Sequence, residues 1–288
     1  MRGADATTEV RQLVINADDL GFSEGINRGI MEAFHAGALR SASVMVGMPA
    51  FADAVRRIHA SDGPGGAVLG VGLHFTLTAG RPLTRAPSLV DERSGEFLSV
   101  GALVRRALRH RIKPREVADE CAAQIARARD AGIRLTHFDA HHHVHLLPGV
   151  REALQSMVRA EGIPFVRRPR EALVGMRLWY RRLPERMLLR ALLRDMEPAS
   201  WGVRMTDHFI GSALLGAARF QAGLLRVLDS LRPGTTELMV HPGYVREPLP
   251  GNDRYTTQRE RELQALMSAD VLSKLHDGSI KLARFDEL

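Results

Sequence analysis

Short apolar segments alternate with helix-like segments along most of this chain, and this alternation restricts its fold more than any other feature. Strand-like segments are predicted at residues 12–17, 41–47, 67–73, 163–167, 236–240 and 279–285. Helices are predicted at residues 23–38, 52–60, 114–131, 148–161 and 257–267, and an irregular loop at 79–96. Because strands that alternate with helices are typical of parallel βα units, we predict an α/β fold.

Four of the apolar runs end in aspartate or histidine. Asp18 and Asp19 follow the first strand, His74 follows the third, residues 139–145 end the run near 136, and His241 follows the strand at 236–240. Parallel strands of a barrel place their carboxyl ends on one face, where barrel active sites lie. Each residue taken singly could also cap a helix or hold a turn. Their shared position favours one common site.

Four histidines and an aspartate crowd the end of the segment THFDAHHHVHLL at residues 136–147. This density of imidazoles favours a metal site, with a solvated His-rich loop as the alternative. If the segment is extended, its side chains alternate between two faces. Asp139, His141, His143 and His145 then share one face, and His142 points to the other. We expect the shared face to supply a metal ligand, a supporting acid and a substrate contact.

Length and composition indicate one globular domain over residues 1–288. Hydrophobic residues make up 45% of the chain and charged residues 25%, which allows a large core. No apolar run reaches the roughly 20 residues that span a bilayer. The polar amino terminus lacks the apolar core of a secretory signal, which predicts a cytoplasmic protein. Cys121 is the only cysteine, so an intrachain disulfide and a cysteine-based zinc site are excluded.

The positive charge does not by itself indicate a nucleic-acid partner. The formal net charge is +7, which would suit a nucleic acid or an anionic membrane surface. Nearly all of this charge is arginine spread along the chain, and few aromatic residues accompany it. We therefore expect no nucleic-acid partner.

Four sequence blocks together resemble the YdjC-type carbohydrate deacetylases. These blocks are NADDLGFSEGINRGIMEAFHAGALRSASVMVGMPAF, GVGLHFTLTAGRPLT, THFDAHHHVHLLPGV and ELMVHPGY. Members of that family remove acetyl from N-acetylglucosamine units of chitooligosaccharides and related sugars. The resemblance implies a distorted, TIM-like (β/α) barrel of the deacetylase type, an N-acetylated sugar substrate and one divalent metal ion.

The matching positions imply roles for four residues. Asp19, His74 and His141 correspond to the metal ligands of the family, and Asp18 corresponds to its general base. Three ligands of the histidine and carboxylate type leave a position open for water, as catalytic metal sites require. Zn, Fe, Mn and Co suit such ligands, whereas Mg prefers more oxygen ligands, so the choice between Mg, Zn and another ion stays open.

His241 is the candidate general acid that protonates the departing sugar nitrogen. Two histidines of the His-rich segment compete for this role, namely His143 and His145. The residues further expected to bind substrate or to support the ligands are Asp139, His143, His145, Tyr244 and Arg259.

Other functions fit parts of the sequence. Residues 21–25, GFSEG, match the G-x-S-x-G pattern of a nucleophile elbow, but the preceding strand ends at Ala17 and Ser23 is better placed to cap a helix. A metal-dependent phosphoesterase or amidohydrolase with an H-x-H site is the stronger enzymatic rival. A non-enzymatic basic binding module leaves the acids and histidines at the strand ends unexplained.

Residues 172–209 are expected to form a helical insertion or lid. A helix can begin at Pro184, with arginines every fourth residue and a wide apolar arc. One interpretation is ordinary packing on the barrel. The other is a lid or membrane-facing segment with three interfacial aromatics, Trp179, Tyr180 and Trp201. The segment resembles the hopanoid-biosynthesis branch of the family, which implies a hopanoid glycolipid substrate and peripheral association with the inner face of the membrane.

Overall fold

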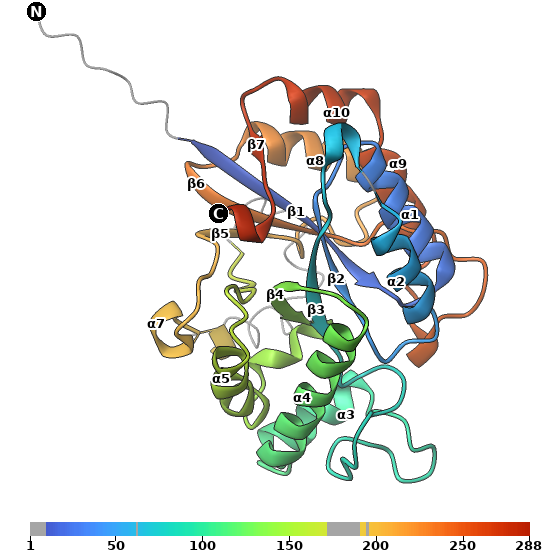
Figure 1. Cartoon of the computed structure of the whole chain (residues 1–288), viewed down its shortest axis with the longest axis vertical. Coiled ribbons are helices and arrows are strands. Elements are labelled where there is room, and N and C mark those ends of the chain that lie inside the picture. The colour runs from blue at the N-terminus through green and yellow to red at the C-terminus, as the bar shows by residue number, and fades with distance from the viewer. Residues whose placement is uncertain (1–9, 62, 172–190, 194–195) are drawn as a thin grey trace, which may run out of the picture.

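The computed structural model describes residues 10–61, 63–171, 191–193 and 196–288, and these form a curled parallel sheet flanked by helices (Figure 1). The strands are β1 (Arg11–Leu20), β2 (Ser41–Val44), β3 (Gly70–Phe75), β4 (Leu135–Ala140), β5 (His208–Ile210), β6 (Gly234–Val240) and β7 (Lys281–Leu282). The helices are α1 (Glu24–His35), α2 (Phe51–His59), α3 (Val100–Leu108), α4 (Pro114–Asp130), α5 (Val150–Ala160), α7 (Pro198–Trp201), α8 (Phe220–Asp229), α9 (Thr257–Leu266) and α10 (Ala269–His276).

Strand β1 occupies the middle of the sheet, whose strand order is β4-β3-β2-β1-β6-β5. It pairs in parallel with β6 from Arg11 to Ala17, with β7 near its start and with β2 near its end. Leu13, Val14 and Ile15 are consecutive and all buried, so both faces of this strand are covered. Such continuous apolar runs are typical of central parallel strands. The α/β class and the parallel sheet are thus confirmed.

The two edges of the curled sheet approach each other through isolated bridges. Val166 pairs with Phe138 of β4, and Glu171 pairs with Phe209 of β5. The predicted strand at 163–167 therefore forms single bridges and no continuous ladder. A complete TIM-like barrel is not confirmed, since the described residues join these edges only at such points.

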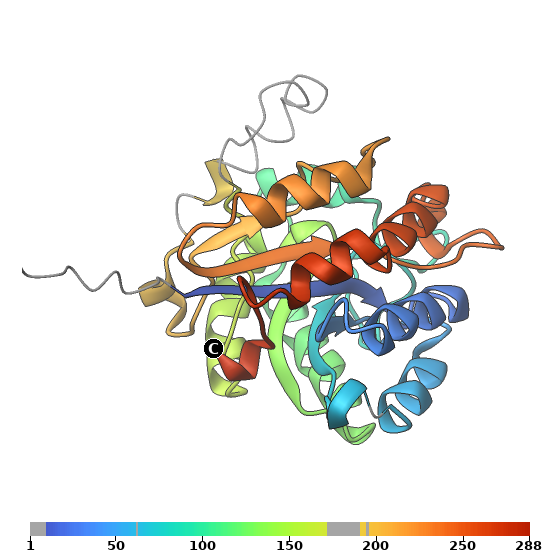
Figure 2. The same ribbon diagram turned by 90° about the horizontal axis from the view of Figure 1, so that it is seen from above.

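Helices lie on the outside of the curled sheet (Figure 2). Helix α1 contacts α2 and α9, α4 contacts α5, and α8 contacts α9 and α10. The helices predicted at 23–38, 52–60, 114–131, 148–161 and 257–267 all occur, and α3, α7, α8 and α10 are additional. Ser23 caps α1, as expected, because its Oγ accepts a hydrogen bond from the backbone N–H of Ile26 at 3.3 Å. A helix cap is a structural role that leaves the elbow interpretation without support.

The predicted insertion at 172–209 is described only in part. Residues 172–190 and 194–195, which include Trp179, Tyr180 and most of the predicted arginine-striped helix, lie outside the described residues. Residues 208–210 form β5 of the main sheet. Trp201 is fully buried in the main core, so its predicted role as an interfacial aromatic is wrong. Among the described helices, none combines the length and apolar character needed to cross a membrane.

Candidate active site

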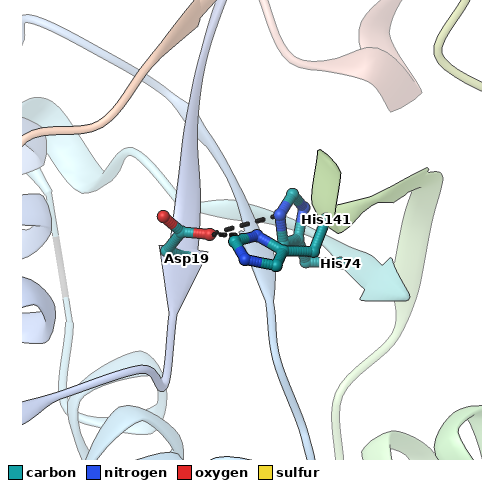
Figure 3. Close-up of side chains that lie close together, drawn as sticks. All are labelled: Asp19, His74 and His141. Atoms are coloured by element: carbon teal, nitrogen blue, oxygen red, sulfur yellow. Dashed lines mark ion pairs between the residues drawn. The ribbon is translucent and has the colours of Figure 1, made fainter. Parts of the chain in front are cut away.

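Asp19 of β1, His74 of β3 and His141, directly after β4, come together at the carboxyl ends of the strands (Figure 3). Asp19 Oδ1 lies 3.2 Å from His74 Nε2 and 3.2 Å from His141 Nδ1. All three side chains are buried, and Asp19 Oδ1 has no hydrogen-bond donor among the described residues. Atoms that share one divalent ion at about 2.1 Å lie about 3.0–3.4 Å apart. These three residues therefore fit a metal ion.

The backbone at the end of β1 brings two consecutive carboxylates to the same site. Strict alternation along a strand would send Asp18 and Asp19 to opposite faces. The pairing register between β1 and β2 shifts between Ala17 and Leu20, and Asp19 has a left-handed φ of 70°. As a result, Asp18 Oδ2 lies 4.0 Å from Nδ1 of His74, while Asp19 Oδ1 faces Nε2 of the same ring.

His74 is held so that Nε2 faces Asp19. Its Nδ1 lies 2.6 Å from Asp139 Oδ1 and 3.2 Å from Ser43 Oγ. An ionised carboxylate only accepts hydrogen bonds, so Nδ1 carries the hydrogen and Nε2 is left for a metal. Burial opposes the charged imidazole, but without a metal Asp139 and Asp18 raise the pKa of His74 to about 10, so a metal bound at Nε2 would have to displace a proton. Asp139, predicted to support a ligand or bind substrate, thus contacts a candidate ligand.

Arg167 is a buried cation at the centre of the acidic residues, and the sequence prediction missed it. Its Nη1 and Nη2 donate to the two oxygens of Asp18 at 2.6 and 2.7 Å, and Nη2 also lies 2.8 Å from Asp139 Oδ2. Its Nε donates to Glu237 Oε1 at 2.6 Å. Arg167 ends the apolar segment 163–167, and this position at the end of an apolar run was the available signal.

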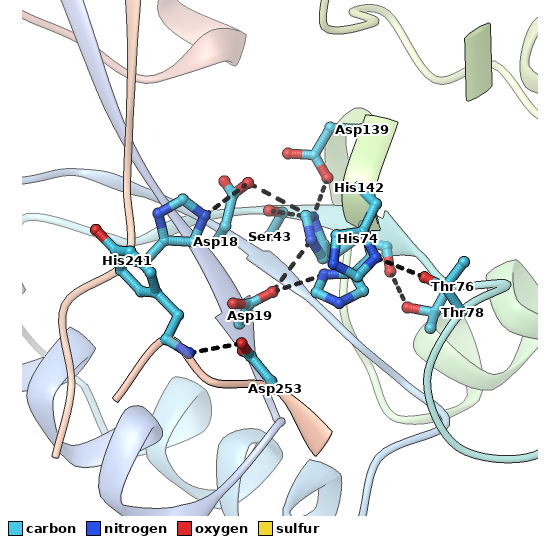
Figure 4. A network of polar contacts seen from close by, with 12 residues as sticks. Asp18, Asp19, Ser43, His74, Thr76, Thr78, Asp139, His142, His241 and Asp253 are labelled. Atoms are coloured by element: carbon cyan, nitrogen blue, oxygen red, sulfur yellow. Dashed lines mark hydrogen bonds and ion pairs between the residues drawn. The ribbon is translucent and has the colours of Figure 1, made fainter. Parts of the chain in front are cut away.

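Asp18 and His241 face each other across a short gap (Figure 4). His241 Nε2 lies 3.9 Å from Asp18 Oδ2, which is too far for a direct hydrogen bond. Burial opposes ionisation of Asp18, but Arg167 and the neighbouring imidazoles hold its pKa well below its usual value. The His241 backbone N–H donates to Glu262 Oε2 at 2.7 Å, and the ring lies edge-on to Tyr255. Asp18 is thus an ionised acceptor beside an imidazole.

Arg259 and Tyr244 occupy different surroundings. Arg259 is buried, and its Nη2 lies 2.7 Å from Asp19 Oδ2 and 2.8 Å from Asp253 Oδ2. It therefore contacts the second oxygen of a candidate ligand, in line with a supporting role. Tyr244 instead donates its hydroxyl hydrogen to Glu32 of α1 at 2.6 Å. This hydroxyl therefore bonds to a helix residue that is not a candidate site residue, and a substrate role for Tyr244 stays a prediction.

The extended arrangement predicted for the His-rich segment is wrong after Ala140. Residues 141–146 form a 3-10 turn in which His142 and His143 have left-handed φ values of 55° and 54°. His142 does not point away from His141, because their ring centroids are 3.9 Å apart. Its Nδ1 lies 2.9 Å from Thr78 Oγ1, and its side chain is exposed beside the candidate metal ligands.

His143 and His145 contact residues outside the candidate ligand group. His143 packs edge-on against Phe209, and Nε2 of His145 donates to the backbone carbonyl of Arg167 at 3.1 Å. Burial, together with Arg167, lowers the pKa of His143 well below its usual value and that of His145 to about 4. These shifts favour the neutral imidazole, which lacks the additional acidic proton of an imidazolium that a general acid would release.

Comparison with known proteins gives one consistent family. The family model described as YdjC-like protein matches residues 12–277. Proteins named carbohydrate deacetylase from Brevibacillus brevis and Geobacillus stearothermophilus are each 34% identical, and the alignments cover 96% of this chain and 99% and 98% of those proteins. The human protein of that name is 33% identical over 96% of this chain and 91% of its own length.

A solved structure has the same fold. This protein from Enterococcus faecalis V583 carries a name that relates it to cellobiose-phosphate cleavage. Its TM-score is 0.76 at 24% identity, with 96% of this chain and 98% of that chain covered. At this identity the likeness shows the fold alone.

Proposed function

This chain belongs to the YdjC-like protein family and to the carbohydrate deacetylases within it, and we propose that it uses a divalent metal ion to hydrolyse the acetamide of an N-acetylglucosamine-type sugar. One observation carries this proposal. The unpartnered Oδ1 of Asp19 faces two imidazole nitrogens at 3.2 Å, and Asp18 and His241 lie beside this group. Candidate ligands, a candidate base and a candidate acid therefore lie close together, which supports the proposal.

Asp19, His74 and His141 are the residues that would hold the ion. A divalent ion bound there would polarise the acetyl carbonyl and make a bound water more acidic. The donor atoms are one carboxylate oxygen and two imidazole nitrogens, which suit Zn, Fe, Mn or Co better than Mg.

Asp18 and His241 each carry out one of the two proton transfers of the hydrolysis. Asp18 Oδ2 accepts the proton of the attacking water as its oxygen bonds to the acetyl carbon. When the bond between that carbon and the sugar nitrogen breaks, His241 Nε2 donates a proton to the nitrogen, and acetate and the free amine are the products. Oδ2 and Nε2 are 3.9 Å apart, so these two atoms are not joined by a direct hydrogen bond. Among the described residues, no hydrogen bond or ion pair joins His143 or His145 to Asp18 or Asp19. This favours His241 as the acid.

The substrate class is the part of the proposal that rests most on the relatives. Proteins named carbohydrate deacetylase imply an acetylated carbohydrate. A hopanoid-linked sugar is the narrower form of this proposal, and it rests on residues 172–209, of which most lie outside the described residues. A soluble and a lipid-linked N-acetylglucosamine compound, assayed side by side, distinguish the two forms.

Acetate release is the direct test of the function. We expect the metal-loaded protein to release acetate from N-acetylglucosamine compounds and no phosphate from sugar phosphate esters. Phosphate release without acetate release would support the phosphoesterase alternative and contradict the proposal.

Replacing the proposed base should separate catalysis from metal binding. In Asp18→Asn the amide keeps the shape of the side chain but cannot accept the proton, so we expect turnover to fall by about 100- to 10,000-fold. Metal content should stay at the wild-type level, because Asp18 is not one of the three proposed ligands. Circular dichroism shows whether the variant is folded, and normal turnover in a folded variant would show that Asp18 is not the base.

A further inference from the structure

Helix α9 and the segment just before it direct three polar side chains toward the active site. Arg259 and Glu262 are three residues apart in α9, which places them on one face of the helix, and Tyr255 lies two residues before the helix begins. The side chains of Arg259 and Glu262 are buried. The same helix packs against α1 and α8, which anchor it. None of these three residues is a candidate ligand, base or acid.

Arg259 determines which oxygen of Asp19 is free for a metal. Its Nη2 lies between Asp19 Oδ2 at 2.7 Å and Asp253 Oδ2 at 2.8 Å, while its Nε donates to the Tyr255 carbonyl at 2.8 Å. The donors of the planar guanidinium have fixed directions, so its contacts to Asp253 and to the Tyr255 carbonyl hold Nη2 against Oδ2 of Asp19. Oδ1 is then left to face the imidazoles of the two candidate ligands.

Glu262 holds His241 from the same helix. Its Oε2 accepts the hydrogen bond from the His241 backbone N–H at 2.7 Å, and its Oε1 accepts one from the Tyr255 hydroxyl. The Tyr255 ring lies edge-on to the His241 ring, with centroids 5.5 Å apart. The Tyr255 hydroxyl also accepts a hydrogen bond from the Gly216 N–H at 2.8 Å. The backbone and the ring of His241 are therefore both restrained.

We propose that α9 positions both halves of the active site: Arg259 aims Oδ1 of Asp19 at the metal, and Glu262 with Tyr255 holds His241 at the reacting nitrogen. This inference rests on the proposed function. Arg259, Glu262 and Tyr255 are positioning residues in this scheme, because they act through Asp19 and His241. Their two effects are separable, since one concerns metal affinity and the other concerns turnover.

The first experiment titrates metal-free protein with Zn²⁺ in competition with a chromogenic chelator. Supporting contacts to metal ligands typically contribute 10- to 100-fold to affinity. We expect Arg259→Met and Arg259→Lys both to weaken Zn²⁺ binding by about that factor, because neither side chain can donate in fixed directions to Asp19, Asp253 and the Tyr255 carbonyl together. Gln264→Ala, on an exposed position of the same helix, is the matched control and should bind as the wild type does.

A pure charge effect predicts the opposite outcome for the same variants. If Arg259 only balances the charge of Asp19, Arg259→Lys should bind Zn²⁺ as the wild type does. Arg259→Met should then bind it more tightly, because the site becomes more negative. Either result would overturn the positioning role of Arg259.

The second experiment examines His241 without relying on activity. We expect Glu262→Ala to speed hydrogen exchange at the His241 amide, because that N–H loses its buried acceptor. Tyr255→Phe keeps the ring and removes only the hydroxyl, so it serves if Glu262→Ala does not fold. Both variants should bind Zn²⁺ within about twofold of the wild type and lose about tenfold in kcat with little change in KM, the effect of one misplaced catalytic group.

The outcomes distinguish this inference from the proposed function. Unchanged exchange and unchanged kcat in folded Glu262→Ala or Tyr255→Phe would contradict the positioning of His241. If the wild type released no acetate while the Arg259 variants still lost Zn²⁺ affinity, the proposed function would fail and the role of Arg259 would stand. If the wild type bound no Zn²⁺ or other divalent ion, both would fail.

Discussion

Asp19 is central to the site because its two carboxylate oxygens have different partners. Oδ2 accepts from Arg259, and Oδ1 faces His74 and His141 without a hydrogen-bond donor among the described residues. A buried anionic oxygen without a partner is costly unless a cation neutralises it. This asymmetry is the strongest physical reason to place a metal at Oδ1.

Replacing any one of the three proposed ligands should strongly weaken metal binding. We expect Asp19→Asn, His74→Gln and His141→Gln each to weaken metal binding by at least about 100-fold, the upper range for losing even a supporting contact. Metal content per chain, measured after identical reconstitution, checks this. His142→Ala is the matched control, because His142 is adjacent but is not part of the proposed ligand group. Full occupancy in all three ligand variants would disprove the site.

Glu237 is the second residue whose environment makes a clear prediction. It is buried in β6, where its Oε1 accepts from Arg167 and its Oε2 has no hydrogen-bond partner among the described residues. Burial raises the pKa of Glu237 to about 7, although Arg167 opposes the shift. Near pH 6, a protonated and therefore uncharged Glu237 fits this buried environment better than an ionised Glu237 would, because Oε2 has no donor to stabilise a charge.

The raised pKa of Glu237 should make the protein less stable as the pH rises. Between its usual pKa of 4.5 and the folded value of about 7, the folded protein binds a proton that the unfolded chain releases. The free energy of unfolding therefore falls as pH rises through this window. Glu237→Gln cannot titrate, so its loss of stability from about pH 5 to about pH 8 in urea unfolding should be smaller. The exposed control Glu92→Gln should follow the wild type, and equal pH dependence in Glu237→Gln would refute the assignment.

At the scale of elements, helix α1 packs directly against the backbone of the segment that follows β6. A Cβ atom on Gly29 would lie 2.6 Å from Gly243 Cα, and one on Gly25 would lie 2.3 Å from the Tyr244 carbonyl oxygen. These glycines allow the backbone after His241 to approach the helix closely. The position of the proposed acid thus depends on the absence of two side chains.

Gly29→Ala should therefore destabilise the protein although alanine favours helices. In an open helix the change would gain about 1 kcal/mol. Here the methyl group meets backbone that cannot rotate away, so we expect a lower Tm and reduced turnover. Gly101→Ala in α3 is the control, because the nearest atom there, Nη1 of Arg105, is 3.8 Å from the added Cβ. A Tm for Gly29→Ala equal to or above that of the wild type would contradict this packing.

At the scale of the whole molecule, the proposed metal joins strands that are distant in sequence. Its ligands come from β1, β3 and the turn after β4, and the unfolded chain cannot bring them together. Metal binding therefore stabilises the folded state, by about 2.7 kcal/mol when the free metal is 100 times Kd. This stabilisation therefore opposes unfolding of the whole domain and not only of the site.

Chelation should accordingly lower the unfolding temperature. For a domain of this size, that energy corresponds to a decrease of roughly 5–10 °C. Thermal unfolding of reconstituted protein with and without a chelator measures the shift. Asp19→Asn should unfold at the same temperature under both conditions. A metal-loaded wild type whose Tm does not respond to chelation would contradict the coupling.

The sequence by itself determined the α/β class and the residues that meet at the strand ends. Apolar runs and the residues that end them are local properties, and parallel strands bring their carboxyl ends to one face whatever the detailed packing. For this reason Asp18, Asp19, His74, His241 and the segment 139–145 could be named before the fold was known, whereas His141 was selected within that segment by the family resemblance.

The tertiary structure alone decided how those residues are held. The turn at 141–146 replaced the expected extended face because its left-handed residues cannot be read from an alternating pattern. Arg167 reaches Asp18 across 149 positions, and Arg259 reaches Asp19 across 240. Such contacts depend on which side chains the folded sheet and helices bring within reach. A local sequence pattern cannot predict contacts between residues so far apart in the chain.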